Sequence, residues 1–313
     1  MRLNEPNVFK MRLHKVVLRR EVRPLKVFCT GDWHVSPIIS EQQYNFLKEA
    51  LEEAEPDVII LQGDLVDSPV ELKRETSLEK LMRELKLCSS FAPTVMVLGS
   101  HDYITPTRPP KKMYDEVIPI WRKICKKCSV KLLMDEWFTA VDGIRIFGSF
   151  QDERCMRLPG QEKYHDNPDG FFACLEDAVD KIADGLPETD ENNEDGFSDV
   201  VWFASHAPLL NDKVIEALKP FDVASFGHTH GGIVPLGMDE IFEKFNLHFG
   251  LISPNHTPFP KRVRGAMPIS ETTTLVVNPG MIATHFCVPK WLQNLNFIKA
   301  AEVSLVEIES AEK

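Results

Sequence analysis

Short apolar runs alternate with longer amphipathic stretches through the first half of the chain. Runs of buried character predict strands at Leu25–Thr30, Val58–Gln62, Thr94–Leu98 and Val130–Met134. Between them, apolar residues at helical spacing predict helices over Glu41–Glu53, Leu78–Cys88 and Asp115–Cys125. Strands that alternate with helices through short connections indicate parallel strands joined by right-handed crossovers. The pattern therefore predicts an α/β protein.

The second half of the chain is less regular. It predicts a helix near Phe171–Ala183 and strands at Ile144–Phe150, Val200–Ala204, Val223–Phe226, Thr273–Val277 and Val303–Ile308. Residues 186–197 are predicted to form a mobile acidic surface loop, because the stretch Glu188 to Asp195 has five carboxylates and no large apolar residue. Residues 1–24 are basic and loosely amphipathic, and we interpret them as a docked arm or an edge strand.

The composition is that of a globular protein. Hydrophobic residues make up 43% and charged residues 27% of the 313 residues, which excludes collagen-like and wholly disordered classes. No apolar run approaches the roughly 18 residues that span a bilayer, and no secretory signal is evident. Seven cysteines without a disulfide-framework spacing fit reduced thiols, so we expect a cytoplasmic location.

Net charge narrows the expected partners. A net charge of −11 argues against sequence-independent binding to long nucleic acids, which needs many Lys and Arg contacts to phosphate. Arg108 to Lys131, however, contains eight basic and two acidic residues, a positive patch that favours phosphate-bearing substrates. Peripheral contact with a membrane surface stays open, and the apolar face of residues 1–24 is weak for that role.

Polar side chains follow the predicted strands. Three early strands end in Asp-Trp-His, Gly-Asp-Leu-Val-Asp and Gly-Ser-His-Asp, and two late ones end in Ser-His and Gly-His-Thr-His. Ligands gather beyond the carboxyl ends of parallel strands. Carboxylates with imidazoles suit Mn, Fe or Zn, and a carboxylate in the middle of such a set can bridge two ions about 3.5 to 4 Å apart. The candidate ligands are Asp32, His34, Asp64, Ser100, His206, His228 and His230.

These segments resemble the calcineurin-like metallophosphoesterases, whose motifs are DxH, GDxxD, GNHD or GNHE, a later lone His, and GHxH. All five blocks occur in order between about residues 25 and 285. The resemblance implies a four-layer α/β/β/α sandwich with two mixed sheets and a dinuclear metal site at the strand ends. We therefore expect residues 25–313 to form one metallophosphoesterase domain that binds two divalent ions.

The resemblance also implies roles for individual residues. Asp32, His34 and His230 would hold the first metal, and Asp64 would bridge both. The second metal would be held by Ser100, His206 and His228. His101 would contact the phosphate and protonate the leaving oxygen, with Asp102 orienting its ring. The family has asparagine where this chain has Ser100, so we expect a weaker second site.

Basic residues outside the motifs are candidates for substrate binding. Arg154 and Arg157 follow the strand that ends near Phe150 and offer bidentate phosphate recognition. The run Lys261-Arg262-Val263-Arg264 is interpreted either as a solvated face or as a contact for an anionic group. The leading hypothesis is a metal-dependent hydrolase of phosphomonoesters or phosphodiesters. The alternatives are a nuclease of the repair-nuclease branch and a non-catalytic interaction module that retains the fold.

Overall fold

The structure of the chain is a computed structural model. It describes residues 9–37, 41–104, 110–151, 168–186, 196–208, 210–232, 234, 238–245, 247–250, 261–281 and 301–311.

In the described part of the chain, two six-stranded mixed sheets form the centre of the molecule. The first sheet has the order β1-β12-β2-β3-β4-β5, in which β12 runs antiparallel to β2 and the other neighbours are parallel. Its strands are β1 (Phe9–Leu18), β12 (Ala301–Ser310), β2 (Leu25–Thr30), β3 (Val58–Leu61), β4 (Thr94–Met96) and β5 (Val130–Leu132).

The second sheet has the order β10-β11-β9-β8-β7-β6. Its four central strands are parallel, and the two edge strands β10 and β6 run antiparallel to their neighbours. The strands are β10 (Gly265–Pro268), β11 (Thr274–Val277), β9 (Val223–Phe226), β8 (Val200–Ala204), β7 (Ile144–Gly148) and β6 (Glu136–Val141).

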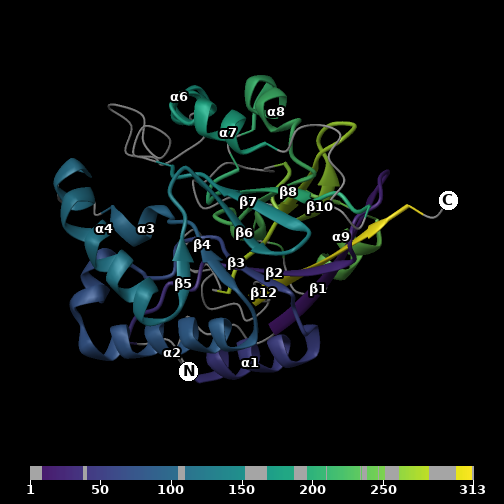
Figure 1. Ribbon diagram of the computed structural model, residues 1–313. Coiled ribbons are helices and arrows are strands. Elements are labelled where there is room, and N and C mark those ends of the chain that lie inside the picture. Colours follow the sequence, from purple (N-terminus) through teal and green to yellow (C-terminus); the bar gives the residue numbers. More distant parts are fainter. Residues whose placement is uncertain are drawn as a thin grey trace.

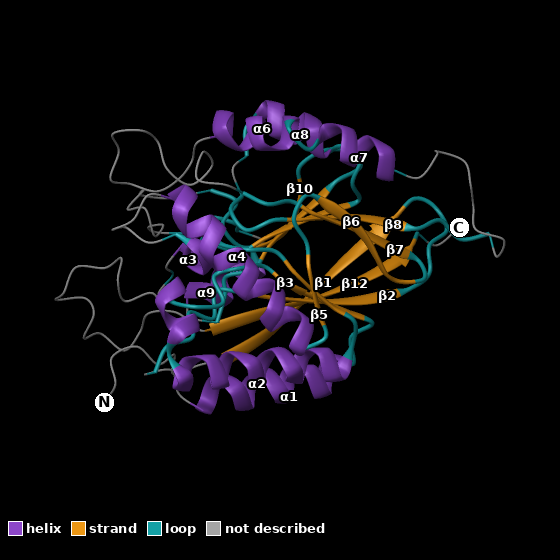
Figure 2. Cartoon of the chain, turned by 60° about the vertical axis from the view of Figure 1, so that its left-hand side comes forward, coloured by secondary structure: helices purple, strands orange, loops and turns teal. Residues whose placement is uncertain are grey.

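Helices cover the outer face of each sheet, which gives four layers (Figures 1 and 2). On the side of the first sheet lie α1 (Glu41–Ala54) and α2 (Glu75–Phe91), and α4 (Pro110–Lys127) contacts β5. On the opposite side lie α6 (Pro168–Glu176), α7 (Val179–Gly185) and α8 (Asp212–Leu218). Shorter helices are η1 (Pro69–Lys73), α3 (Ser100–Tyr103), η2 (His230–Gly232) and α9 (Met238–Lys244).

The core explains why the strands are so uniformly apolar. Val27 of β2 packs in one buried cluster with Ile60 of β3 and Trp202 of β8, between the sheets. Its neighbour Phe28 belongs to a second cluster with Leu51 of α1, on the helix side. Because alternate side chains point to opposite faces, a strand that is buried on both faces needs apolar residues at nearly every position. The predicted α/β/β/α sandwich with two mixed sheets is confirmed.

The predicted strands are found within a few residues of their expected bounds, and β1 lies at the edge of the first sheet. The pattern of apolar and polar residues did not predict β6, β10, α8 and α9. The single helix expected over Phe171–Ala183 is interrupted by a turn at residues 177 and 178, between α6 and α7.

Most of the predicted acidic loop, residues 187–195, lies outside the described residues. Among the described helices, none has both the length and the apolar character needed to cross a membrane.

Candidate metal centre

The candidate ligands lie in the turns that follow β2, β3, β8 and β9, and at the start of α3. Backbone hydrogen bonds join these turns side by side. Asp32 N donates to Gly63 O at 2.8 Å, and His34 N donates to Asp64 O at 3.0 Å. The two sheets meet here, because His228 N, after β9, donates to Asp32 Oδ2 at 3.0 Å. Sequence segments almost 200 residues apart therefore converge on one site.

Five of the candidate ligands have a left-handed backbone conformation, which residues other than glycine rarely adopt. Their φ angles lie between 46° and 68°. A residue in this region turns the chain sharply at the end of the strand. The five residues are Asp32, His34, Asp64, His228 and His230.

Two glycines make the close approach of these turns feasible. A Cβ atom at Gly99 would collide with both Asp64 and His206. A Cβ atom at Gly227 would lie 2.7 Å from Asp32 Oδ2. The glycines of the Gly-Ser-His-Asp and Gly-His-Thr-His blocks are thus needed because ligand side chains pass directly over the backbone.

The first group of candidate ligands is formed by Asp32, His34 and His230. One ligand atom from each lies within 4.8 Å of the others. His230 Nε2 is 3.7 Å from Asp32 Oδ1, and the ring centres of His34 and His230 are 5.4 Å apart. All three side chains are buried. The structure brings together the three residues that were expected around the first metal.

The second group is formed by Asp64, His206 and His228, again with ligand atoms within 4.8 Å of one another. His206 Nε2 lies 3.2 Å from Asp64 Oδ2 and 3.0 Å from His228 Nδ1. The other ring nitrogen of His206 is 2.7 Å from the carbonyl oxygen of Gln62. That carbonyl can only accept, so it holds the proton on Nδ1 and directs Nε2 toward Asp64, an arrangement common for metal-binding histidines.

Asp64 lies between the two groups. Its Oδ2 atom is 3.2 Å from His206 Nε2 and 3.9 Å from His34 Nε2. Its other oxygen, Oδ1, accepts a hydrogen bond of 2.8 Å from the backbone of His101. One carboxylate therefore faces both groups, which is the position that a bridging ligand requires.

Ser100 is the first residue of α3 and is buried beside this arrangement. It follows Gly99, whose backbone abuts Asp64 and His206. The backbone of Ser100 is therefore next to the second group. Arg154 and Arg157, the expected substrate contacts, lie outside the described residues.

His101 is held by a different residue from the one expected. The carbonyl oxygen of Asp67 lies 2.7 Å from His101 Nδ1. Asp102, the predicted orienting residue, instead accepts hydrogen bonds from the backbone of Leu65, Val66 and Gly99 at 2.8 to 3.2 Å. Successive residues of a helix point about 100° apart, so Asp102 of α3 faces away from the ring beside it. Asp102 ties α3 to the turn after β3.

Asp67 is a further residue of this site, absent from the predicted set. Its Oδ1 atom is 3.8 Å from His34 Nδ1, and ligand atoms of His34, Asp67 and His101 lie within 4.8 Å of one another. The signal was present in the sequence, because Asp67 is the second aspartate of the Gly-Asp-Leu-Val-Asp block. The neighbouring His34 lowers the pKa of this carboxyl group.

The buried charges of the site favour a cation. Burial alone would lower the pKa of His206, but Asp64, Asp32 and the Gln62 carbonyl together outweigh burial and raise that pKa to about 9. Burial likewise acts to raise the pKa of Asp64, but His206, His101 and His34 together outweigh burial and hold that pKa well below its usual range. Burial raises the pKa of Asp32 to about 6. The negative field that stabilises a proton on His206 stabilises a metal ion equally.

Two buried atoms support the fit of a metal at this site. Among the described residues, Asp32 Oδ1 and His34 Nε2 have no hydrogen-bond partner. Buried polar atoms are nearly always paired, so atoms left unpaired among other ligand atoms indicate that a ligand completes the site. Oxygen and imidazole donors without thiolates suit Mn, Fe or Zn.

Comparison with known proteins identifies a family of phosphoesterases. A family model described as calcineurin-like phosphoesterase matches residues 25–232. A Bos taurus transmembrane protein with metallophosphoesterase domain is 23% identical over 263 residues, which cover 82% of this chain and 48% of that protein. One of the subunits of the nuclease SbcCD, from Staphylococcus epidermidis, is 32% identical over 91 residues, which cover 25% of this chain and 23% of that protein.

Among solved structures, a dimetal phosphatase from Danio rerio aligns over 82% of this chain and 87% of its own. Its sequence identity is 12% and its TM-score is 0.42. The chain spans about half the length of the first relative and about a quarter of the second.

Proposed function

Because the chain belongs to the calcineurin-like phosphoesterase family, we propose that it is a hydrolase of phosphomonoesters or phosphodiesters that uses two divalent metal ions. The observation that carries this proposal is the carboxylate of Asp64, which lies 3.2 Å from His206 and 3.9 Å from His34, between two groups of buried ligands. A single metal site would not need a buried carboxylate that faces both groups.

We assign the ligands as follows. Asp32, His34 and His230 would hold one ion, and His206 and His228 the other, with Asp64 shared. Ser100, which is buried beside the second group, would complete the second site. Two such ions would supply a nucleophilic water at neutral pH and neutralise charge on the phosphoryl oxygens. Manganese, iron and zinc all suit this donor set.

His101 is the proposed acid. The Asp67 carbonyl can only accept a hydrogen bond, so the nitrogen that faces it, Nδ1, carries a hydrogen. The other ring nitrogen, Nε2, is the atom through which His101 would give a proton to the leaving oxygen. The ring of His101 lies 4.7 Å from the ring of His34, so the acid is adjacent to the first group of ligands.

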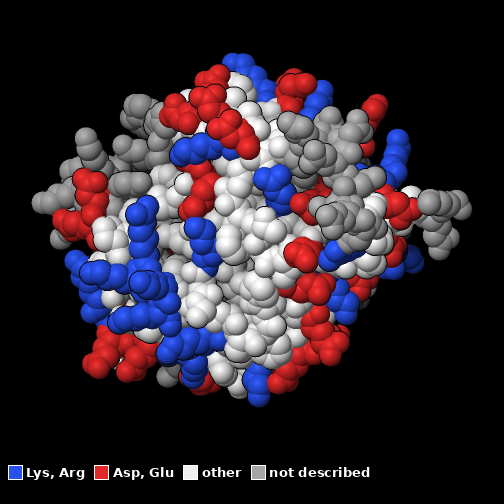
Figure 3. Space-filling model, viewed as in Figure 1, with Lys and Arg blue, Asp and Glu red and all other residues white. Residues whose placement is uncertain are grey.

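A nuclease is the second candidate, favoured by the 32% identity over 91 residues with the SbcCD nuclease subunit. The net charge of −11 argues against it, because long nucleic acids are bound through many cationic contacts. Lys and Arg do gather on one side of the molecule, near α4 at the lower left of Figure 3. That patch is local, and we propose that it attracts small phosphate-bearing substrates.

A substrate panel tests the proposal. The protein is stripped with a chelator, reloaded with Mn, Fe or Zn, and assayed on aryl phosphomonoesters, aryl phosphodiesters, nucleotides, and single- and double-stranded DNA. We expect metal-dependent hydrolysis of at least one small ester and little cleavage of DNA. DNA cleavage that exceeds small-ester hydrolysis would favour the nuclease, and no metal-dependent hydrolysis of any substrate would favour a non-catalytic module.

A matched pair of variants ties the activity to the site. Asp64→Asn should abolish hydrolysis and reduce metal content, because a neutral amide bridges two cations poorly. Asp142→Asn makes the same chemical change at an exposed carboxylate and should retain both. Equal activity of the two variants would contradict the assignment of Asp64.

A further inference from the structure

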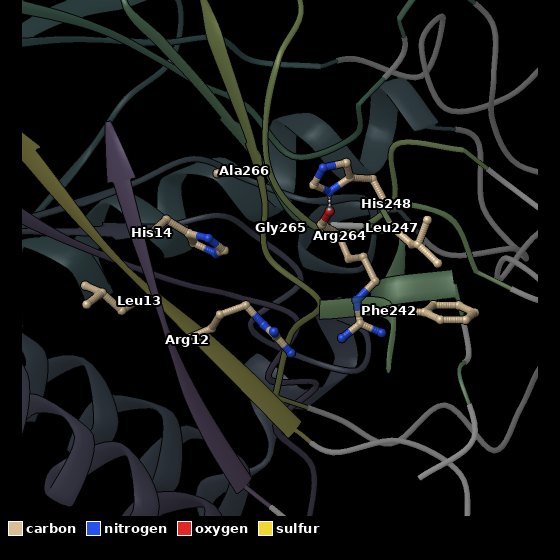
Figure 4. Close-up of a pocket in the computed structure, with 9 residues that line it drawn as sticks. All are labelled: Arg12, Leu13, His14, Phe242, Leu247, His248, Arg264, Gly265 and Ala266. Carbon is tan, nitrogen blue, oxygen red and sulfur yellow. Dashed lines mark hydrogen bonds between the residues drawn. The ribbon is translucent and has the colours of Figure 1, made fainter. Parts of the chain in front are cut away.

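A second cavity lies outside the candidate metal centre (Figure 4). It has a volume of about 170 Å³ and lies between β1, α9 and the start of β10. None of the seven candidate metal ligands lines it. Among the described residues, its lining includes two arginines and two histidines, Arg12, His14, His248 and Arg264, and no acidic residue. The other described residues of the lining are apolar or glycine, including Phe242 and Leu247.

The two arginines share one carboxylate. Arg12 donates from Nε and Nη2 to the two oxygens of Glu302, at 2.8 and 2.9 Å. Arg264 Nη2 lies 3.6 Å from Glu302 Oε2. Two guanidinium groups and one carboxylate together carry a net positive charge. The arginines line the cavity and Glu302 is not among its lining residues, so the cluster gives this wall a net positive charge.

The arginines are held in place before any ligand arrives. The side chains of Arg12 and Arg264 are 10% exposed, and that of Glu302 is 2% exposed. Arg12 and Glu302 come from paired strands of the first sheet, whereas Arg264 precedes β10 of the second. Figure 4 shows both guanidinium groups directed toward the same space. Buried arginines in a fixed orientation lose little conformational entropy when they bind an anion.

The cavity is connected to the metal centre through a short chain of hydrogen bonds. Thr229, between His228 and His230, donates from Oγ1 to the carbonyl oxygen of Val263 at 2.7 Å. Val263 N donates to His248 O at 2.9 Å, and His248 Nδ1 is 3.0 Å from Arg264 O. The wall of the cavity and the turn that presents two candidate ligands thus form one connected unit.

We propose that this cavity binds a phosphate group, at a site distinct from the candidate metal centre. Guanidinium groups bind phosphate oxygens, and the cavity is lined by Arg12 and His14 of β1 on one wall and by His248 and Arg264 on the other. The cavity is below the roughly 300 Å³ of pockets for drug-sized ligands. It therefore accommodates a small anion, or one phosphate of a longer molecule.

Crystals of the metal-loaded protein soaked in selenate, a tetrahedral phosphate analogue, provide the test of location. We expect an anomalous peak within hydrogen-bonding distance of Arg12 and Arg264. Absence of that peak in crystals that show selenate at the metal centre would overturn the proposal. A peak that appears only at the high selenate concentration of the crystal soak, without measurable phosphate binding at this site in solution, would also overturn the proposal.

Calorimetric titration of the metal-loaded protein with inorganic phosphate provides the test in solution. Arg264→Gln should weaken one phosphate site by about 10- to 100-fold, the loss expected for a charged hydrogen bond, and leave binding at the metal centre intact. Arg23→Gln, at an arginine 39% exposed and paired with exposed Asp142, should change neither. If Arg264→Gln does not fold, Arg264→Lys replaces it, with a smaller loss expected. Phosphate binding that is identical in wild type and variant would mean that the arginine and glutamate cluster only joins the two sheets.

Kinetics separate the two sources of phosphate. Hydrolysis of a small aryl phosphomonoester should be unchanged by Arg264→Gln, since such a substrate has no second phosphate. If Arg264→Gln raises the KM only for substrates with two phosphates, the cavity binds the second phosphate of the substrate. If the variant leaves the KM unchanged for substrates with one and with two phosphates, the cavity binds free phosphate. The binding test stands whether or not the protein hydrolyses any of these esters, so its failure is distinguishable from failure of the proposed function.

Discussion

The backbone of the candidate ligands is under strain. Asp32, His34, Asp64, His228 and His230 all have φ near +50° to +70°, and such conformations cost on the order of 1 to 3 kcal/mol each. The surrounding hydrogen bonds maintain them, for example His228 N to Asp32 Oδ2. Strained polar residues concentrated at one point are typical of functional sites.

Replacement of His101 tests the proposed acid. His101→Ala should leave metal content nearly intact and slow the hydrolysis of esters with poor leaving groups by roughly 10² to 10⁴-fold, the contribution of a general acid. Esters with activated aryl leaving groups need less protonation and should be slowed less. The measurement is kcat across a leaving-group series. Equal losses across the series would show that His101 does not protonate the leaving oxygen.

Ser100 is the residue at which the chain departs from the family motif. A serine hydroxyl is a shorter and weaker donor than the asparagine carboxamide, so we expect Ser100→Asn to tighten the second metal site. Activity should rise at limiting metal and converge with wild type at saturating metal, since added ion compensates for affinity. Metal titrations of Ser100→Asn are compared with those of Ser90→Asn, at an exposed serine of α2. If the wild type binds both metal ions with equal affinity, Ser100 is as strong a ligand as the asparagine of the family motif.

The chemical identity of the site was predictable from the sequence, whereas its hydrogen bonding was not. Spacing and residue type predicted Asp32, His34, Asp64, His206, His228 and His230, which the structure brings together. The family resemblance implied that Asp102 orients His101, whereas in the structure the Asp67 carbonyl contacts the His101 ring. A backbone carbonyl has no side-chain signature, so no motif could have revealed this contact.

Elements buried on both faces were the easiest to predict. Every residue of β3, β8 and β9 is buried, and each of these strands reads as an almost uninterrupted apolar run. β6 has only partly buried or exposed residues, so its sequence lacks that signal. α8 and α9 have seven residues each, too few to show a helical period clearly. Burial, more than intrinsic propensity, separates the predicted elements from the missed ones.

Glu84 of α2 is a buried carboxyl group that should make stability depend on pH. Burial raises its pKa to about 8, and among the described residues its Oε2 atom has no hydrogen-bond partner. The folded state therefore retains a proton that the unfolded state releases above pH 4.5. The free energy of unfolding should fall by up to about 1.4 kcal/mol per pH unit as pH rises from 5 to 8, and level off above that.

Urea unfolding of a matched pair of variants measures this effect. Glu84→Gln cannot ionise, so it should be more stable than wild type at pH 8 and similar to it at pH 5. Glu79→Gln, at an exposed position of the same helix, should follow the wild-type pH profile. A constant difference between Glu84→Gln and wild type across this range would show that Glu84 is not protonated in the folded protein.

At the scale of the whole molecule, a late strand, β12, pairs with the two earliest strands of the first sheet. β12 pairs with β1 and β2, so residues 301–310 enter the sheet between two strands from the first 30 residues. Local patterns predict a strand at this position, but its neighbours depend on contacts almost 300 residues apart. Arg20, just after β1, pairs with Asp222, just before β9, at 2.5 Å and so joins the two sheets. Periodicity predicted the strands but did not predict this strand order.

The central claim is that two metal ions share Asp64. Metal analysis by mass spectrometry, with anomalous diffraction to locate the ions, tests it most directly. We predict two ions per chain, one in contact with Asp32, His34 and His230, the other in contact with His206 and His228, and both in contact with Asp64. A single ion at full hydrolytic activity, or ions bound away from Asp64, would contradict this account.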